Sequence, residues 1–280
     1  MTTWLITGAS SGLGAALARA VLDRGDNAVV TARNTDHLLD LTTAYPDTAL
    51  AVPLEIGAHD QVVNAVEAAT ARFGSVDVLV NNAGHGYRAA VEEAAVDEVD
   101  ELFATNFFGP VDLIKQVLPQ MRARRSGTIV NVSSIGAPRS NPGSGYYTAT
   151  KTALEGVSDA LRREVEPLGI RVLVLEPGAF RTDFSGRSLK QSRTVIADYA
   201  DTAGKRRIEN DTTHGTQQGD PDRAATVIID AVYADQAPFR LLLGSDATQI
   251  VRDELQGRID EIDAWAHVSR TTDFPGEERA

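Results

Sequence analysis

The sequence contains no cysteine among its 280 residues. Disulfide bonds, thiolate catalysis and cysteine-based metal sites are therefore excluded, and a cytoplasmic protein without a metal is expected. No apolar run approaches the roughly 20 residues that span a bilayer, so no membrane partner is expected. The N-terminal MTTWLITG has no basic segment before its short apolar run, which argues against a signal peptide.

Basic residues are too few to balance the acidic ones. With 27 Lys and Arg against 39 Asp and Glu, the formal net charge is −12. Because nucleic-acid binding relies on Lys and Arg to neutralise phosphates, we expect no nucleic-acid partner. The one basic cluster, KRR at Lys205–Arg207, is followed by IEND and is interpreted as a solvated loop.

Short apolar runs alternate with segments of helical period over most of the chain. Strands that are apolar on both faces and alternate with helices are typical of a doubly wound α/β fold, so we predict one Rossmann domain with a parallel sheet of about seven strands. In the first helical segment, Leu13, Leu17 and Val21 recur at helical spacing and Gly25 supplies a stop. The predicted strands are residues 3–7, 27–31, 49–53, 76–80, 127–132, 171–176 and 239–244.

No linker, repeat or break in composition divides residues 1–280, so a single domain is predicted. The alternation lapses between Pro177 and Asp220, in polar stretches such as SGRSLKQSR and NDTTHGTQQGD. A long excursion after a late strand is typical of a lid, which we place at residues 179–220. Residues 245–270 are expected to form a C-terminal helical extension.

The stretch TGASSGLG after the first predicted strand allows two interpretations. Its G-x-S-x-G spacing around Ser10 matches the turn that carries a nucleophilic serine in α/β hydrolases, with His214 or His267 as the histidine required downstream. Neither histidine has an identifiable orienting partner. Alternatively, Gly8, Gly12 and Gly14 allow a tight turn, close backbone approach and close helix packing, which lets a dinucleotide pyrophosphate sit on a helix N-terminus. The phosphate interpretation uses more of the residues.

Five further motifs follow in a characteristic order. NNAG at Asn81–Gly84 follows the fourth strand, Asn106 lies in the helical stretch ELFATNFFG, and NVSS ends at Ser134. The run YTATK at Tyr147–Lys151 comes next, and Pro177–Gly178 follows the sixth strand. Together with TGASSGLG, these motifs resemble the short-chain dehydrogenase/reductase family over roughly residues 3–245. The resemblance implies hydride transfer between a nicotinamide cofactor and a small-molecule carbonyl or alcohol, as in a carbonyl reductase or alcohol dehydrogenase.

Tyr147 and Lys151 are four residues apart, so on a helix they face the same way, whereas Tyr146 is turned aside. A free phenol has a pKa of about 10. A nearby lysine cation is expected to lower the pKa of Tyr147 and make it a usable acid/base. The resemblance implies that Lys151 also holds the nicotinamide ribose.

The resemblance assigns two more catalytic residues. Ser134 is expected to hydrogen-bond the substrate oxygen. Adjacent residues at a strand end point to opposite sides, so Ser133 does not share this role. Asn106 corresponds to the family's catalytic asparagine, which ties Lys151 into a water relay. Without the resemblance, Asn106 reads as an ordinary polar helix residue.

The resemblance also implies cofactor contacts beyond the glycine turn. Asn82–Gly84 match the segment that passes the adenine-side ribose, and Pro177–Gly178 with Thr182 match the one that orients the carboxamide. In LEI at 54–56, Glu55 stands where the family often has the Asp that meets adenine. The full predicted set is Gly8, Ser10, Ser11, Gly12, Leu13, Gly14, Arg33, Glu55, Ile56, Asn82, Ala83, Gly84, Tyr147, Lys151, Pro177, Gly178 and Thr182.

The end of the second strand, VVTARN, indicates the cofactor. An acid there would bind the ribose 2′-OH of NAD and repel a 2′-phosphate. The sequence instead has Ala32 and then Arg33, whose guanidinium suits a phosphate. We therefore predict NADP(H) over NAD(H). Ser11 stands where some NADP-dependent relatives have a second basic residue.

The substrate itself is left open by the sequence. The predicted lid contains Phe180, Phe184 and Tyr199 among many polar residues, which fits an aromatic or polyketide-like ketone as well as a smaller polar carbonyl. His85 either lines the substrate site or lies in a surface loop. A homodimer or homotetramer is expected by analogy, because helices 111–123 and 152–166 carry apolar stripes. The alternative functions are a cofactor-binding regulatory protein and a serine hydrolase that uses Ser10.

Overall fold

The computed structural model describes residues 1–186, 188–208 and 215–274, and its central element is a parallel sheet. Seven strands lie in the order β3-β2-β1-β4-β6-β7-β9. Each overlaps one of the seven apolar runs, so the predicted doubly wound sheet is confirmed. The strands are β1 Thr3–Ile6, β2 Asn27–Ala32, β3 Ala49–Pro53, β4 Val78–Asn81, β6 Gly127–Val132, β7 Ile170–Pro177 and β9 Arg240–Leu243.

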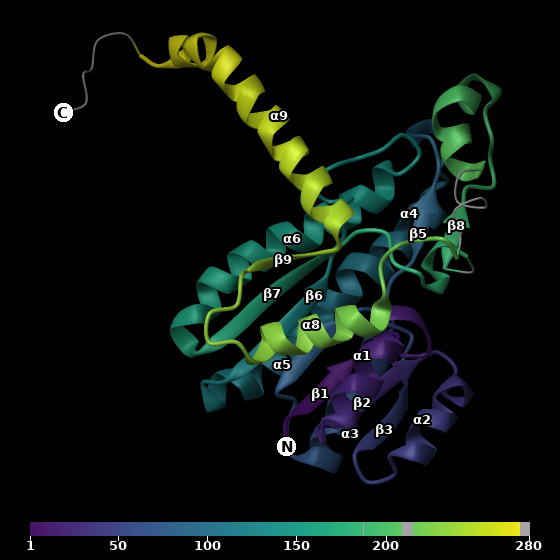
Figure 1. The fold of residues 1–280 in the computed structure, drawn as a ribbon, viewed down its shortest axis with the longest axis vertical. Coiled ribbons are helices and arrows are strands. Elements are labelled where there is room, and N and C mark those ends of the chain that lie inside the picture. The colour runs from purple at the N-terminus through teal and green to yellow at the C-terminus, as the bar shows by residue number, and fades with distance from the viewer. Residues whose placement is uncertain (187, 209–214, 275–280) are drawn as a thin grey trace.

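Helices cover both faces of the sheet because successive side chains of a strand point to opposite sides. Trp4 and Ile6 pack with α1 (Gly12–Asp23) and α8 (Pro221–Tyr233), which lie side by side in Figure 1. Leu5 packs with α3 (His59–Phe73), α5 (Gly109–Arg124) and α6 (Gly145–Val165) on the other face. The short helix α2 (Leu39–Ala44) lies beside β3, and α4 (Val96–Phe103) precedes α5.

Local signals in the sequence set the helix ends. Gly25 adopts φ +88° after α1, and its N–H bonds to the Leu22 carbonyl oxygen at 2.9 Å, which confirms the predicted stop. Asp220 caps α8 by accepting a hydrogen bond from the Asp222 N–H at 2.9 Å. Pro221 occupies the first helical position, where its missing N–H costs nothing.

The strand order changes direction at β1, which has β2 on one side and β4 on the other. In open parallel sheets, ligands bind outside the carboxyl ends of the strands at such a switch point. The glycine turn follows β1, and the NNAG run begins at Asn81, the last residue of β4. Both segments therefore lie at the edge of the sheet formed by the carboxyl ends of the strands. The topology therefore places the predicted site between these two segments.

The excursion between β7 and α8 contains a strand of its own. The strand β8 (Leu189–Gln191) pairs in parallel with β5 (Gly86–Arg88), which lies just after NNAG. The interpretation of KRR as a solvated loop is wrong for Arg207. Lys205 is exposed, but Arg207 is only 8% exposed because its side chain pairs with Glu93.

The last helix, α9 (Ser245–Ser269), extends away from the sheet in Figure 1. Ala247 and Val251 in its first two turns are buried, whereas Ile259 and Trp265 further along are 50% and 61% exposed. Only the start of this helix therefore belongs to the core. In the described part of the chain, no helix has the length and apolar character that crossing a membrane requires.

This division of α9 predicts unequal effects of truncation. A chain cut after Gln256 keeps Ala247 and Val251 in place, and its Tm should stay within about 3 °C of the full chain, because little buried area is lost. A chain cut after Gly244 loses both, and its Tm should fall by roughly 5 °C or more. Thermal unfolding of both proteins tests this. Equal losses would show that the outer part of α9 also stabilises the fold.

Candidate active site

The turn between β1 and α1 depends on glycine for its shape. Gly8 and Gly12 have φ +66° and +58°, a region that residues with a Cβ rarely adopt. A Cβ on Gly14 would lie 2.4 Å from the Asn82 amide nitrogen and 2.5 Å from the Gly8 carbonyl oxygen. No side chain fits there. The other predicted contacts of this turn are the half-buried Ser10, Ser11 and Leu13.

The first turn of α1 suits an anion. In this fully described helix, the N-cap Ser11 makes no side-chain capping bond and the first turn holds no acidic residue. A helix N-terminus presents backbone N–H groups and the positive end of the helix dipole, which favour phosphate. Gly12 also has no side chain of its own to cover the backbone of the turn. Together, these features fit the pyrophosphate of a dinucleotide.

The Asn82–Gly84 segment is hydrogen-bonded to the glycine turn. The Thr7 hydroxyl oxygen accepts bonds from the N–H groups of Asn82 and Ala83 at 3.0 and 2.9 Å. The Asn82 amide in turn donates to the carbonyl oxygens of Thr7 and Gly8 at 2.8 and 3.1 Å. Thr7 was not among the predicted residues. These bonds bring the two predicted cofactor segments together.

At the ends of β2 and β3, the predicted residues have different environments. Arg33 is exposed directly after β2, next to the buried Ala32. Glu55 is also exposed, and its backbone N–H bonds to the Gln61 side-chain oxygen at 2.7 Å. Ile56 is only 4% exposed and packs with the helices α3 and α5. Its side chain therefore belongs to the core.

The turn after β7 is held by the start of α9. Pro177 ends the strand, and Gly178 follows with no room for a side chain, because a Cβ would lie 2.4 Å from the Asp246 carboxylate oxygen. Thr182 lies against the glycine turn, where its Cβ is 3.1 Å from the position that a Cβ on Gly12 would take. The three predicted residues of this segment thus reach the same edge as the glycine turn.

Helix α6 carries the predicted catalytic pair on its buried face. Tyr147 and Lys151 are both buried, and the Lys151 Nζ lies 5.9 Å from the centre of the Tyr147 ring. Ser134, which follows β6, lies close enough to the Tyr147 phenol to lower its pKa. Tyr146 is turned aside, and its hydroxyl donates to the Val91 carbonyl oxygen at 3.0 Å. The structure thus brings Ser134, Tyr147 and Lys151 together.

The pKa of Tyr147 departs from the sequence expectation. Burial raises it above its ordinary value, and the hydrogen bond with Ser134 and the charge of Arg88 only partly oppose that rise. Lys151 was expected to lower this pKa, which is wrong. Its ammonium instead donates to the Val132 carbonyl oxygen at 2.8 Å, and burial lowers the pKa of Lys151 to about 8. The phenol therefore keeps its proton at neutral pH.

Asn106 lies in a π-helical turn, Ala104–Phe108, between α4 and α5. Such turns frequently occur at functional sites. Its fully buried carboxamide accepts a bond from the His85 N–H at 3.0 Å and donates to the His85 carbonyl oxygen at 2.9 Å and the Thr150 hydroxyl at 3.3 Å. Asn106 thereby joins the segment after NNAG to the residue that precedes Lys151.

The histidines whose roles the sequence did not decide lie in different parts of the chain. His85 is half-buried, and its pKa is lowered to about 4, mainly by burial and next by the charge of Lys190. Its imidazole is therefore neutral at physiological pH. Of the two histidines named for the hydrolase alternative, His267 is exposed on α9 and His214 lies outside the described residues.

A cluster of two buried carboxylates and the exposed Arg240 next to the predicted catalytic pair was not predicted. Glu155 lies one turn beyond Lys151 on α6 and accepts a bond from the Ser133 hydroxyl at 2.6 Å. The Arg240 Nε lies 3.1 Å from a Glu155 oxygen and 3.5 Å from a Glu176 oxygen. The four-residue spacing of Lys151 and Glu155 could have indicated from the sequence that both lie on the same face of the helix. The approach of Arg240 from β9 has no local signal.

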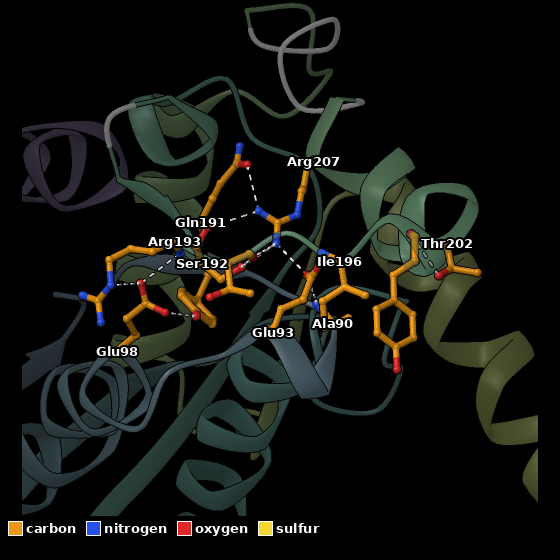
Figure 2. Close-up of polar contacts among 12 residues, drawn as sticks. Ala90, Glu93, Glu98, Gln191, Ser192, Arg193, Ile196, Thr202 and Arg207 are labelled. Atoms are coloured by element: carbon orange, nitrogen blue, oxygen red, sulfur yellow. Dashed lines mark hydrogen bonds and ion pairs between the residues drawn. The ribbon is translucent and has the colours of Figure 1, made fainter.

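A second cluster involves the excursion. Arg207 pairs with Glu93, as Figure 2 shows, and the excursion also carries Phe184, whose ring centre lies 5.9 Å from that of Tyr147. The last arginine of a basic cluster in a polar run gives no sign of burial, so sequence reasoning missed Arg207. Phe184 was expected as an aromatic residue of the lid, without a partner.

Comparisons with known proteins agree with the motifs. The profile of the family described as short chain dehydrogenase matches residues 2–193. The chain is 37% identical to oxidoreductase BOA17 of Botryotinia fuckeliana, with 88% of this chain and 90% of that protein covered. It is 36% identical to the 3-ketodihydrosphingosine reductase of Bacteroides thetaiotaomicron, with 86% and 87% covered.

Solved structures share the fold over nearly the whole chain. A short-chain dehydrogenase from Streptomyces avermitilis has a TM-score of 0.91 and 43% identity, with 97% of this chain and 98% of that chain covered. An alcohol dehydrogenase from Thermococcus sibiricus, complexed with 5-hydroxy-NADP, has a TM-score of 0.70 and 26% identity over 87% and 96%. A 3-ketoacyl-(acyl-carrier-protein) reductase from Brucella melitensis, complexed with NADH, has a TM-score of 0.70 and 28% identity, with 86% of this chain and 96% of that chain covered. Structural neighbours thus bind nicotinamide cofactors of both kinds.

Because Glu176 is a buried carboxyl, we expect the stability of the protein to depend on pH. Burial and then the charge of Glu155 raise the pKa of Glu176 to about 7, while Arg240 opposes them. Between the unfolded pKa and pH 7, the folded protein therefore binds more protons than the unfolded chain, and stability falls as the pH rises. Glu176→Gln stays neutral, so its stability relative to wild type should increase from pH 5 to pH 8 by about 1–3 kcal/mol.

Urea unfolding of both proteins at several pH values measures this difference. The exposed Glu164 on α6, changed to Gln, controls for the loss of a surface carboxylate. A stability difference between Glu176→Gln and wild type that is the same at pH 5 and pH 8 would contradict the raised pKa.

Proposed function

Because the chain belongs to the short-chain dehydrogenase family of oxidoreductases, we propose that it transfers hydride between NADP(H) and a ketone or secondary alcohol. The observation that carries this proposal is the buried Tyr147 phenol beside Ser134 and Lys151, at the same sheet edge as the glycine turn. The substrate is then a small-molecule carbonyl or alcohol, and Tyr147 is its acid/base.

Three segments at the switch point would hold the cofactor. The N–H groups at the start of α1 would bind the pyrophosphate, Asn82–Gly84 would hold the adenine-side ribose, and Pro177, Gly178 and Thr182 would orient the carboxamide. The Lys151 Nζ, which lies 3.6 Å from the position of a Cβ on Gly84, binds the nicotinamide ribose. When bound, the cofactor supplies or accepts the hydride.

In the reducing direction, Tyr147 donates a proton to the substrate oxygen. Burial keeps the pKa of Tyr147 above its ordinary value, so the phenol is in the acid form at neutral pH. The positive charge of Arg88, which opposes that rise, stabilises the negative charge that develops on the phenol oxygen as the proton leaves. Ser134 also orients the substrate oxygen by a hydrogen bond.

Asn106 acts on the site through its neighbours. Its bonds to His85 and Thr150 fix the segment after NNAG against α6. This arrangement holds Lys151 in place next to the backbone of Gly84. In our proposal Asn106 also ties Lys151 into a water relay.

Arg33 supports NADP(H) over NAD(H). It is exposed at the end of β2, and the preceding Ala32 offers no carboxylate to a ribose 2′-OH. A guanidinium can bind a phosphate with two parallel hydrogen bonds. Arg33 would therefore bind the 2′-phosphate.

Tyr147→Phe tests the acid/base role. A phenyl ring packs alike but carries no proton, so kcat should fall by about 10²–10⁴-fold while NADPH binding stays near that of wild type. Tyr146→Phe is the matched control, because its hydroxyl bonds to Val91 away from the site. Turnover is followed at the nicotinamide absorbance over a panel of carbonyl compounds. If Tyr147→Phe keeps more than half of the activity, the assigned mechanism is wrong.

Arg33→Ala tests the cofactor preference. A charge-assisted hydrogen bond is worth roughly 1.5–3 kcal/mol, which corresponds to about 10–100-fold weaker NADPH binding. NADH binding should hardly change. Ala32→Asp should weaken NADPH further and strengthen NADH, because a carboxylate repels the phosphate and accepts from the 2′-OH. Dissociation constants at one ionic strength decide the matter. A wild type that prefers NADH, or equal weakening of both cofactors in Arg33→Ala, would refute this role.

A further inference from the structure

The excursion is tied to the rest of the fold by one buried ion pair. The side chains of Glu93 and Arg207 are 2% and 10% exposed, and an Arg207 guanidinium nitrogen lies 2.6 Å from a Glu93 carboxylate oxygen. Glu93 lies just before α4, whereas Arg207 lies in the excursion beyond β8. Figure 2 shows the guanidinium pointing into a group of polar atoms from the excursion and from the Glu93 segment.

Glu93 uses both carboxylate oxygens on backbone groups. One oxygen accepts a bond from the Ala90 N–H at 2.7 Å, and the other accepts from the Ile196 N–H at 2.9 Å. The first bond closes the turn before α4, and the second reaches the excursion. Since a buried carboxylate needs such partners, the contacts of Glu93 fix two segments of backbone at once.

Arg207 binds several atoms of a single turn. It donates to the Ser192 hydroxyl, to the carbonyl oxygens of Ser192 and Thr194 at 3.4 Å each, and to the Gln191 side chain at 3.5 Å. The planar guanidinium spans these acceptors with a fixed geometry that an ammonium does not reproduce. This turn directly follows β8, so Arg207 holds the end of that strand.

The strand β8 leads from the ion pair to the catalytic tyrosine. Its partner β5 begins at Gly86, where a Cβ would lie 2.6 Å from the Leu189 Cδ1 and 3.4 Å from the Phe184 ring. Phe184 in turn lies against Tyr147. A displacement of β8 would therefore move Leu189 and Phe184 relative to the phenol.

The other ion pairs of the excursion that the described residues form are more exposed, including that between Arg193 and Glu98, with side chains 65% and 12% exposed. Arg193 pairs with Asp97 at 2.8 Å, with side chains 65% and 69% exposed, and Lys190 pairs with the exposed Glu101. Exposed pairs contribute little and are screened by salt. Among the ion pairs of the described part of the excursion, the Glu93–Arg207 pair is thus the most buried.

We propose that Glu93 and Arg207 are positioning residues for substrate recognition, because their buried pair fixes β8 and the Phe184 segment against Tyr147. This inference rests on the proposed reductase function. Neither residue touches the reacting atoms. Their loss acts first on β8 and the Phe184 segment, whereas the glycine turn after β1 and the Asn82–Gly84 segment after β4 are held together by their own hydrogen bonds.

Arg207→Met and Glu93→Gln test the proposal, with Arg193→Met as the matched control on the same segment. Both test variants should raise KM for the carbonyl substrate by about 10-fold or more, because small displacements at a reactive site have large effects. The Kd for NADPH should stay within about twofold of wild type, a difference well below 1 kcal/mol. Arg207→Lys, which keeps the charge without the planar fork, should fall between Arg207→Met and wild type. Arg193→Met should behave as wild type.

Hydrogen exchange gives a readout that does not depend on turnover. The backbone of residues 188–208 should exchange at least about tenfold faster in Arg207→Met than in wild type, with the strands of the main sheet unchanged. Faster exchange across the whole chain, or a cofactor Kd that rises with the substrate KM, would show a general loss of stability and overturn the proposal. An unchanged substrate KM would overturn it as well.

The two failures are distinguishable. If wild type shows no nicotinamide-dependent turnover with any carbonyl, the proposed function is wrong, and the exchange measurement still decides whether the pair holds the segment. If Arg207→Met does not fold, Glu93→Gln and Arg207→Lys carry the same comparison, because both keep a polar side chain at the buried position.

Discussion

The contact between the glycine turn after β1 and the Asn82–Gly84 segment after β4 is the constraint on which the rest of the site depends. Four hydrogen bonds cross this junction. Each joins the side chain of Thr7 or Asn82 to a backbone group of the opposite segment. Because Gly14 has no side chain, the Asn82 amide can lie against its backbone. Because β1 and β4 are neighbours at the switch point, this junction lies where ligands bind in open parallel sheets.

Burial controls the charges near that junction. It raises the pKa of Tyr147 and lowers that of Lys151 to about 8, so both groups are less easily charged than in water. Glu155, one turn from Lys151, supplies a negative charge that favours the ammonium. The phenol thus keeps its proton, as the proposed acid role requires, and the Val132 carbonyl oxygen and the charge of Glu155 both favour the lysine cation.

The substrate side is built differently from the cofactor side. The cofactor segments are turns at the ends of core strands, whereas the segment that carries Phe184 follows the last of them and is held by the short β5–β8 pair and by Glu93 with Arg207. Variation in this segment leaves the main sheet untouched. That separation allows one scaffold to keep its cofactor chemistry while its substrate changes.

Local patterns were enough to predict the strands, the stop at Gly25 and the common face of Tyr147 and Lys151, because each depends on residues close together in the chain. The family resemblance added Ser134, which the structure places beside Tyr147. Only the tertiary structure decided that Arg207 is buried, that Arg240 reaches Glu155 and Glu176, and that the pKa of Tyr147 rises. These outcomes depend on the burial and charge contributed by partners far away in the sequence, which no local pattern records.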